Sequence, residues 1–302
     1  MRVRRSRRTT AGSDAVASAS RNASLPRRAP SVTGFAGATF PYREGEKRRS
    51  GPSGQRTEGS GARMSYNWNW GVLLQDPYLG WLISGVGWTL AVSAAAWVIA
   101  FALGSIVGVA RTLPNRFVRG AATAFVELFR NIPLLVQLFL WYFVVPELLP
   151  EDWGRWVKRD LPLPEYTTAV VGLGFYTASR VAEQVRSGIE SIPRGQTLAG
   201  YASGLTTGQL YRYILLPVGY RLIIPPLTSE FLTIFKNSSL ALTIGVLELT
   251  AQSRQITEYT FQGFEAFTAA TVIYVVITLS VTAAMGLVER RARMPGFIAG
   301  GR

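Results

Sequence analysis

The longest run without charge limits the possible folds of this chain more than any other feature of its sequence. No Asp, Glu, Lys or Arg occurs between Pro77 and Ala110. A helix needs about 20 mostly apolar residues to cross the roughly 30 Å hydrocarbon core of a membrane. Residues 81–110 therefore predict a membrane-spanning helix, and the chain is expected to be an integral membrane protein.

Four later segments are also long and apolar enough to predict spans. They are 121–145, 166–186, 217–235 and 266–288. Pro225-Pro226 is expected to kink the fourth of the five spans, because proline lacks the backbone N–H and clashes with the preceding turn. The polar run 236–239 follows as a break. The predicted fold is all-α, with about five transmembrane helices in residues 64–302.

The charges of the loops predict how these spans are oriented. The loops after spans one, three and five are basic, whereas residues 146–165 hold three basic and five acidic residues. Lys and Arg collect on the cytoplasmic side of membrane proteins. We expect a multi-pass protein of the bacterial inner membrane, with its N-terminus outside and its C-terminus in the cytoplasm.

Residues 1–63 differ from the rest in charge and composition. They hold 14 Lys and Arg against 4 Asp and Glu, a net charge of +10, and no long apolar run. Such a composition predicts disorder, and carrying it outside would oppose the positive-inside tendency. One interpretation is a basic tail for nucleic acid or anionic lipid. We favour the other, that translation begins at Met64 and that the segment is a mis-annotated extension.

The residues that are missing exclude several kinds of chemistry. The chain has no Cys and no His, so thiolate and imidazole metal sites and nucleophile pairs that depend on these residues are excluded. None of the three lysines, Lys47, Lys158 and Lys236, follows a glycine, so no Walker phosphate loop is present. We expect a transport subunit rather than an enzyme, and any ATP and magnesium to be bound by a partner.

The longest cytoplasmic loop, residues 188–217, predicts a compact pair of short helices. Capping rules suggest one helix around Gln196–Ser203, a stop at Gly204 and an N-cap at Thr206. A second helix is expected to end before Pro217. A loop of this kind projects from the membrane and suits docking into a soluble partner.

This loop resembles the coupling loop of ATP-binding-cassette (ABC) importer permeases of the polar amino-acid family. The matching stretches are Ile192–Gln196, Ala199, Gly204-Leu205 and Ile214–Pro217. Three further stretches are similar to motifs of the family's later spans, namely Glu127–Gln137, Ala182–Ile189 and Pro225–Phe231 with Lys236–Leu240. Details in Met64–Trp70, Arg180–Gln184 and Met294–Phe297 look most like the glutamate/aspartate subgroup.

The resemblance implies a type I importer permease that works with several partners. These are two ATPase subunits, a second permease subunit, identical or paralogous, and an extracytoplasmic substrate-binding protein, together with membrane lipid and no nucleic acid. The residues implied in ATPase coupling are Arg194, Gly195, Gln196, Leu198, Ala199, Gly204, Leu205 and Pro217. Leu198 stands where the wider family commonly has Glu, and Arg180 where it tends to have an aromatic residue.

Ionisable residues at membrane depth are costly and usually face the bundle interior or a water-filled cavity. Glu127 with Arg130, and Arg180 with Glu183, have i,i+3 spacing, so each pair is able to neutralise itself on one helix face. Alternatively, the Arg180 guanidinium binds a substrate carboxylate. Lys236 is a second candidate, or it extends to the outer headgroups. The candidate substrate path comprises Arg180, Glu183, Lys236, Asn237 and Ser238.

Other functions explain the sequence less well than an importer of polar, acidic amino acids. An ion-coupled secondary amino-acid transporter is expected to show repeated halves with matching broken helices, and only the fourth span is predicted to be broken. A nucleic-acid binder would use only residues 1–63. A membrane enzyme would have to work without His or Cys.

Overall fold

The computed structural model describes residues 66–292, and within that range all regular structure is helical. The extension predicted at 1–63 and the stretch Met294–Phe297 lie outside the described residues.

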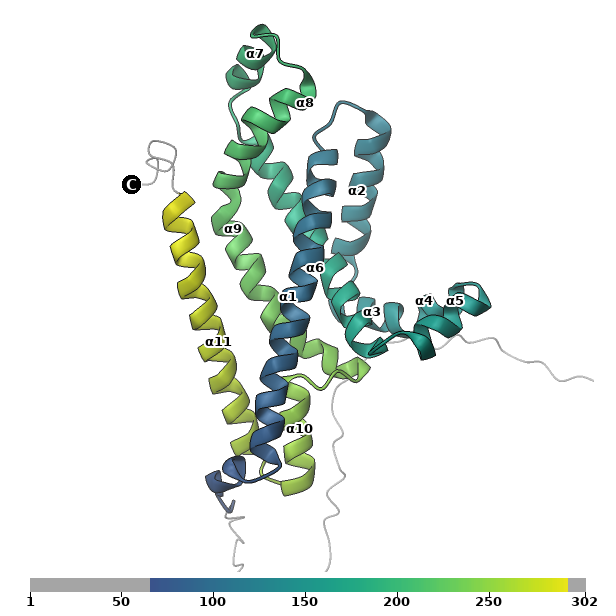
Figure 1. The fold of residues 1–302 in the computed structure, drawn as a ribbon, viewed down its shortest axis with the longest axis vertical. Coiled ribbons are helices and arrows are strands. Elements are labelled where there is room, and N and C mark those ends of the chain that lie inside the picture. The colour runs from purple at the N-terminus through teal and green to yellow at the C-terminus, as the bar shows by residue number, and fades with distance from the viewer. Residues whose placement is uncertain (1–65, 293–302) are drawn as a thin grey trace, which may run out of the picture. The chain divides into compact units, whose positions relative to one another are not determined.

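Six helices build the bundle, and shorter elements connect them (Figure 1). The six are α1 (Tyr78–Ala110), α2 (Arg116–Asn131), α6 (Pro164–Glu190), α9 (Leu216–Asn237), α10 (Leu249–Thr260) and α11 (Gly263–Ala292). The shorter helices are η1 (Trp70–Leu74), α3 (Leu134–Phe139), α4 (Val145–Leu148), α5 (Glu151–Arg155), α7 (Arg194–Ala202), α8 (Thr207–Leu210) and η5 (Ser238–Ile244). Three π-helical turns are η2 (Leu140–Val144), η3 (Trp156–Asp160) and η4 (Tyr211–Leu215).

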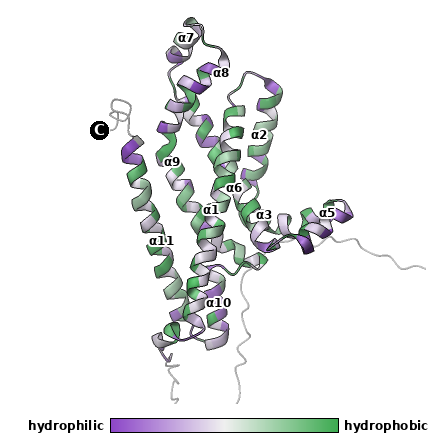
Figure 2. Cartoon of the chain, in the orientation of Figure 1, coloured by the Kyte–Doolittle hydropathy of each residue, from purple (hydrophilic) through white to green (hydrophobic). Residues whose placement is uncertain are grey.

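Helices α1 and α11 are each long and apolar enough to cross a membrane unaided, as predicted for residues 81–110 and 266–288. Up to four spans result if two bent pairs, α2 with α3–α4 and the 207–244 helices with α10, each count as one. Hydrophobic residues cover much of α1, α9 and α11, whereas hydrophilic residues gather on α7 and α5 (Figure 2). The predicted third span coincides with α6, which carries several charges and packs against α1, α2 and α9.

The segment predicted as a span over 121–145 is bent rather than straight. Helix α2 ends at Asn131, and the helical segment from Leu134 continues at 105° to it. The break follows from Pro133, which has no N–H and forces Ile132 into an extended conformation (φ −95°, ψ 128°). Gln137 stabilises the break, since its side-chain amide donates to the carbonyls of Phe129 (2.6 Å) and Ile132 (2.9 Å).

The fourth span runs further than predicted. Pro225 and Pro226 both lie inside α9 without ending it, and the helix stops only at Asn237. The expected polar break is therefore confirmed, and its form is the 3₁₀ helix η5 followed by Gly245 in the left-handed region (φ 96°). From there the chain turns by 49° into α10.

The most extensive helix contact joins α1 to α6, and two glycines of α1 lie in it. A Cβ on Gly104 would lie 2.7 Å from the Cβ of Val181, and one on Gly108 would lie 2.7 Å from the carbonyl oxygen of Ala182. The small-xxx-small spacing thus lets the two backbones approach.

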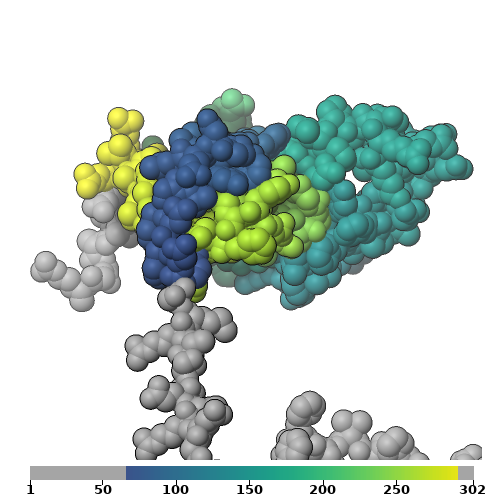
Figure 3. Space-filling model, turned by 90° about the horizontal axis from the view of Figure 1, so that it is seen from below, coloured from purple at the N-terminus to yellow at the C-terminus, as the bar shows by residue number. Residues whose placement is uncertain are grey.

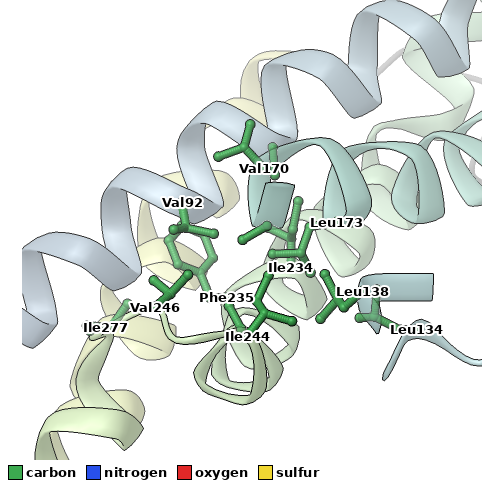
Figure 4. Close-up of a cluster of buried hydrophobic side chains, with 13 residues drawn as sticks. Val92, Leu134, Leu138, Val170, Leu173, Ile234, Phe235, Ile244, Val246 and Ile277 are labelled. Atoms are coloured by element: carbon green, nitrogen blue, oxygen red, sulfur yellow. The ribbon is translucent and has the colours of Figure 1, made fainter. Parts of the chain in front are cut away.

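The main hydrophobic core gathers side chains of six helical elements, among them Ile277 of α11, as Figure 4 shows. Val92 of α1 and Leu173 of α6 meet Ile234 of α9, with Leu138 of α3 and Ile244 of η5 alongside. Seen from below, the start of α1 lies against α10, and the α4–α5 region extends to one side (Figure 3).

Candidate functional site

The coupling unit, which we define as residues 194–215, folds as the capping signals predict. Gly204 ends α7 with φ 80°, and the N–H of Leu205 donates to the carbonyl of Gly200 (3.2 Å). This is the hydrogen bond of a Schellman helix end, for which glycine is favoured because it has no Cβ. Thr206 then starts α8 with a capping box shared with Gln209. Both cap predictions are confirmed.

One boundary of this unit differs from the prediction. No helix ends before Pro217, because the chain continues from α8 through the π turn η4 into α9, where Pro217 lies in the first turn. The coupling unit is therefore joined to α9 by an unbroken run of helix.

The coupling unit presents apolar side chains at its surface. Leu198 is 67% exposed, and Tyr201 and Tyr213 are also exposed. Arg194, Gly195 and Ala199 are exposed too, whereas Gln196 and Leu205 are half-buried. Its inner side is tightly packed, since a Cβ on Gly200 would lie 2.5 Å from Leu210 of α8.

Arg180 does not pair with Glu183. Its Nε donates to Glu230 of α9 at 2.6 Å, and the Glu230 side chain is only 8% exposed. Glu183 instead accepts from Arg111, which follows α1, and from Arg186 (2.6 Å). Three residues along a helix turn a side chain by about 60° net, so positions 180 and 183 of α6 face different neighbouring helices.

The predicted pair of Glu127 and Arg130 is not formed either. Both residues are exposed on α2, and the Glu127 carboxylate accepts from the side-chain amide of Asn131 at 3.2 Å. Asn131 also donates to the Glu127 carbonyl (2.8 Å) at the end of the helix. The partner of Glu127 is thus Asn131, four residues along the same helix.

Lys236 lines an open cavity of about 530 Å³ between the end of α9, α10 and α11. Its lining surface is mainly apolar, although five of the eight lining residues carry a hydroxyl group. The lining residues are Lys236, Ser239, Thr250, Thr271, Tyr274, Val275, Thr278 and Leu279. Lys236 is exposed and forms no ion pair within residues 66–292. We call this space the Lys236 cavity.

Asn237 and Ser238, the other two candidate substrate-path residues at the predicted polar break, do not line this cavity. Ser238 is fully buried, and its hydroxyl donates to the Phe235 carbonyl at 2.7 Å. Asn237 is half-buried at the last position of α9. Ser238 therefore caps backbone, and of the three predicted residues only Lys236 faces the open space.

Sequence reasoning missed Glu248, a fully buried carboxylate behind the cavity wall. It caps α10 by accepting from the N–H groups of Thr250 (3.0 Å) and Ala251 (2.9 Å), and it also accepts from the Tyr274 hydroxyl (2.6 Å). Glu248 thus holds Tyr274 in the wall. An acidic residue immediately before a helix is a recognisable N-cap signal, so this role was readable from the sequence.

Comparison with known families decides where the chain belongs. Residues 100–294 match the family of binding-protein-dependent transport system inner membrane components. The chain belongs to this family. The permease is therefore an inner-membrane transport component and not an enzyme.

Curated relatives agree with this assignment. The permease is 49% identical over 245 residues to the glutamate/aspartate import permease protein GltJ of Escherichia coli K12, covering 78% of this chain and 100% of that protein. It is 31% identical over 233 residues to the glutamine transport system permease protein GlnP of the same strain, covering 76% and 100%. The predicted resemblance to polar amino-acid ABC permeases, and to their glutamate/aspartate subgroup, is confirmed.

Solved structures share the fold. A crystal structure of an amino acid ABC transporter with histidines has 28% identity and a TM-score of 0.65, covering 75% of this permease and all of that chain. The inward-facing MetNI methionine ABC transporter, at 24% identity and a TM-score of 0.60, supports the fold alone and covers 73% of the permease and all of that chain. The predicted all-α type I permease fold is confirmed.

Proposed function

We propose that the permease forms the path of an ATP-driven importer for acidic amino acids, and that Lys236 binds the substrate's surplus carboxylate. The full-length match to a glutamate/aspartate import permease supports the substrate class. The observation that carries the residue assignment is the cation of Lys236, which faces a cavity with several hydroxyl-bearing residues in its wall and has no acidic partner within 66–292.

Charge balance favours Lys236 over Arg180 as the substrate-binding cation. Arg180 is already neutralised by the buried Glu230, so a second carboxylate would have to compete with that ion pair. A lone cation at membrane depth costs at least about 2.5 kcal/mol on insertion scales, and an anionic substrate offsets that cost at Lys236. Ser239, Thr250 and Tyr274 add hydroxyl groups for the polar part of an amino acid.

The coupling unit of each permease is proposed to bind one ATPase subunit. A transporter with two permease subunits therefore carries two ATPase subunits. The exposed Leu198 and tyrosines of the coupling unit suit an apolar pocket on the ATPase. ATP and magnesium are then bound by the ATPase, because this chain has no Walker loop. A substrate-binding protein delivers the amino acid from the outer side.

The proposed orientation has the N-terminus outside and the C-terminus in the cytoplasm. Arg111 and Arg116 lie where α1 ends and α2 begins, at the same end as the coupling unit, which Tyr211 joins to Thr112. Arg290 and Arg291 lie in the last turn of α11. This gathering of basic residues is typical of a cytoplasmic face.

The test compares Lys236→Gln with Arg254→Gln in proteoliposomes supplied with saturating binding protein. Arg254 is an exposed cation of α10 paired with Glu258 four residues on, so it controls for loss of one charge. A charge-assisted hydrogen bond is worth about 1.5–3 kcal/mol, or roughly tenfold to a hundredfold. Glutamate uptake is expected to fall by that factor for Lys236→Gln only. Equal uptake by the two variants would remove Lys236 from the path.

A further inference from the structure

One tyrosine links the coupling unit to a helix that does not follow it in sequence. The Tyr211 hydroxyl donates to the backbone carbonyl of Thr112 (3.0 Å) and lies 3.0 Å from the Thr112 side-chain oxygen. Within residues 66–292, all other side-chain hydrogen bonds of the coupling unit stay inside it. Tyr211 therefore makes the one side-chain hydrogen bond contact between this unit and the rest of the described chain.

The acceptor, Thr112, lies at the end of α1, where α1 is joined to α6. Thr112 directly follows Arg111, the residue after the last turn of α1, and the Arg111 guanidinium pairs with Glu183 of α6. The Thr112 hydroxyl is itself held by the carbonyl of Val109 (2.8 Å). A force applied to Thr112 thus reaches α1 through the backbone and α6 through the ion pair.

The donor, Tyr211, lies where the coupling unit continues into α9. Tyr211 is the first residue of the π turn η4, and its carbonyl accepts the N–H of Leu216 at the start of α9. Motion of the coupling unit passes to α9 through this continuous helix. A π turn is a common place for a local change in a helix, so the run of helix into α9 does not by itself fix the coupling unit against α1.

We propose that Tyr211 is a positioning residue that makes α1 follow the coupling unit during the ATPase cycle. This inference rests on the proposed docking of the ATPase at that unit. Leu215 also belongs to a hydrophobic cluster against which Val109 of α1 packs, but apolar contacts are non-directional. The hydrogen bond to Thr112 fixes direction because its strength depends steeply on angle.

The chain offers a closely matched control for this tie. Tyr211→Phe removes the hydroxyl and keeps the ring. Tyr213→Phe removes the hydroxyl of a tyrosine two residues on that is 63% exposed and has no hydrogen-bond partner among the described residues. Thr112→Ala removes only the side-chain acceptor and leaves the carbonyl, so a smaller effect than that of Tyr211→Phe is expected.

The first measurement needs neither ATP nor substrate. The chain has no cysteine, so spin labels are placed only where cysteines are introduced, at exposed Arg119 of α2 and exposed Ala202 of α7. The label-to-label distance distribution of the full-length permease in nanodiscs is expected to broaden in Tyr211→Phe and to stay unchanged in Tyr213→Phe. An unchanged distribution in Tyr211→Phe would overturn the inference.

The second measurement is the number of ATP molecules hydrolysed per amino acid imported by the reconstituted transporter. Tyr211→Phe is expected to raise this ratio about twofold to tenfold, the range that corresponds to one hydrogen bond, while ATPase binding is retained. A purely structural role would lower both rates together and leave the ratio constant, which contradicts the inference. Failure of the wild type to import acidic amino acids would instead refute the proposed function. The distance measurement would still test whether the Tyr211–Thr112 hydrogen bond holds the coupling unit in place.

Discussion

Arg180 and Lys236 carry the same charge but have different surroundings. Arg180 is engaged across the α6–α9 contact by a carboxylate that is itself buried, whereas Lys236 faces open space. A buried charge that loses its partner is strongly destabilising, while replacing both partners is often tolerated. Substituting one or both members of the Arg180–Glu230 pair therefore tests whether Arg180 stabilises the fold or binds substrate.

We predict that Arg180→Gln lowers the stability of the permease by about 3–5 kcal/mol, because Glu230 is left buried without a cation. Adding Glu230→Gln should recover most of that loss. The measurement is thermal unfolding in mild detergent, with Arg155→Gln as the control. Arg155 forms an exposed pair with Glu151, and such pairs contribute about 0–1 kcal/mol. If the double variant is no more stable than Arg180→Gln alone, the ion pair with Glu230 is not the reason that Arg180 stabilises the permease.

At the scale of single elements, glycines act in two distinct ways. Gly104 is required for space, because α6 lies against it. Gly204 is required for conformation, because its backbone is left-handed although nothing lies within 4 Å of its Cβ position. Alanine at each position tests these two reasons separately. Gly87 of α1 and Gly208 of α8 are controls, because neither has an atom within 4 Å of its Cβ position nor a left-handed backbone.

We predict that Gly104→Ala destabilises the α1–α6 contact by about 1–3 kcal/mol, the usual cost of overpacking. Its added Cβ would lie 2.7 Å from Val181 and 2.8 Å from the carbonyl of Ala178. The control is Gly87→Ala on the same helix, where no atom lies within 4 Å. Thermal unfolding of the two variants side by side is the measurement. Equal midpoints would mean that α1 and α6 separate enough to admit a methyl group.

Gly204→Ala is predicted to disturb the coupling unit and leave the membrane bundle intact. A left-handed non-glycine residue costs about 1–2 kcal/mol, which is enough to shift the α7–α8 turn. Co-purification of the ATPase with the permease should fall, while insertion and thermal unfolding stay near wild type. Gly208→Ala, at an open position inside α8, should not weaken ATPase binding. Normal binding by Gly204→Ala would place the ATPase contact elsewhere.

At the scale of the whole molecule, the first described residues close one end of the bundle. Glu265 of α11 is fully buried and accepts from the Tyr66 hydroxyl and from the N–H of Asn69 (2.8 Å). The Tyr66 ring packs edge-on against Phe264, and burial together with the Glu265 carboxylate raises the pKa of Tyr66. The phenol therefore stays a donor at neutral pH.

We predict that a chain begun at Met64 inserts and transports like the full chain, whereas one begun at Gln75 is less stable. Loss of the donors leaves a buried carboxylate unsatisfied, at a cost of about 1–3 kcal/mol. Thermal unfolding and glutamate uptake of both truncations are the measurements. Loss of insertion in the Met64 form would show that residues 1–63 are needed. Equal stability of the two truncations would show that the contact with Glu265 is unimportant.

Features that depend on neighbouring residues were predictable from the sequence. Hydropathy located α1 and α11, and the glycine and threonine signals located the turn at Gly204 and the cap at Thr206. The break at Ile132-Pro133 was also encoded locally, but an apolar stretch averaged over 25 residues concealed one proline. These features are local because helix length, capping and proline strain involve only a few residues along the chain.

Only the tertiary structure decided which side chains meet. Sequence spacing allowed Arg180 to pair with Glu183. In the structure Arg180 faces α9 and pairs with Glu230, whereas Glu183 faces the end of α1 and pairs with Arg111. The Lys236 cavity and the contact of Tyr211 with Thr112 join residues from separate helices. The physical reason is that an ion pair or hydrogen bond requires atoms within about 3–4 Å. The packing of helices against each other sets those distances, and the periodicity of any one helix does not.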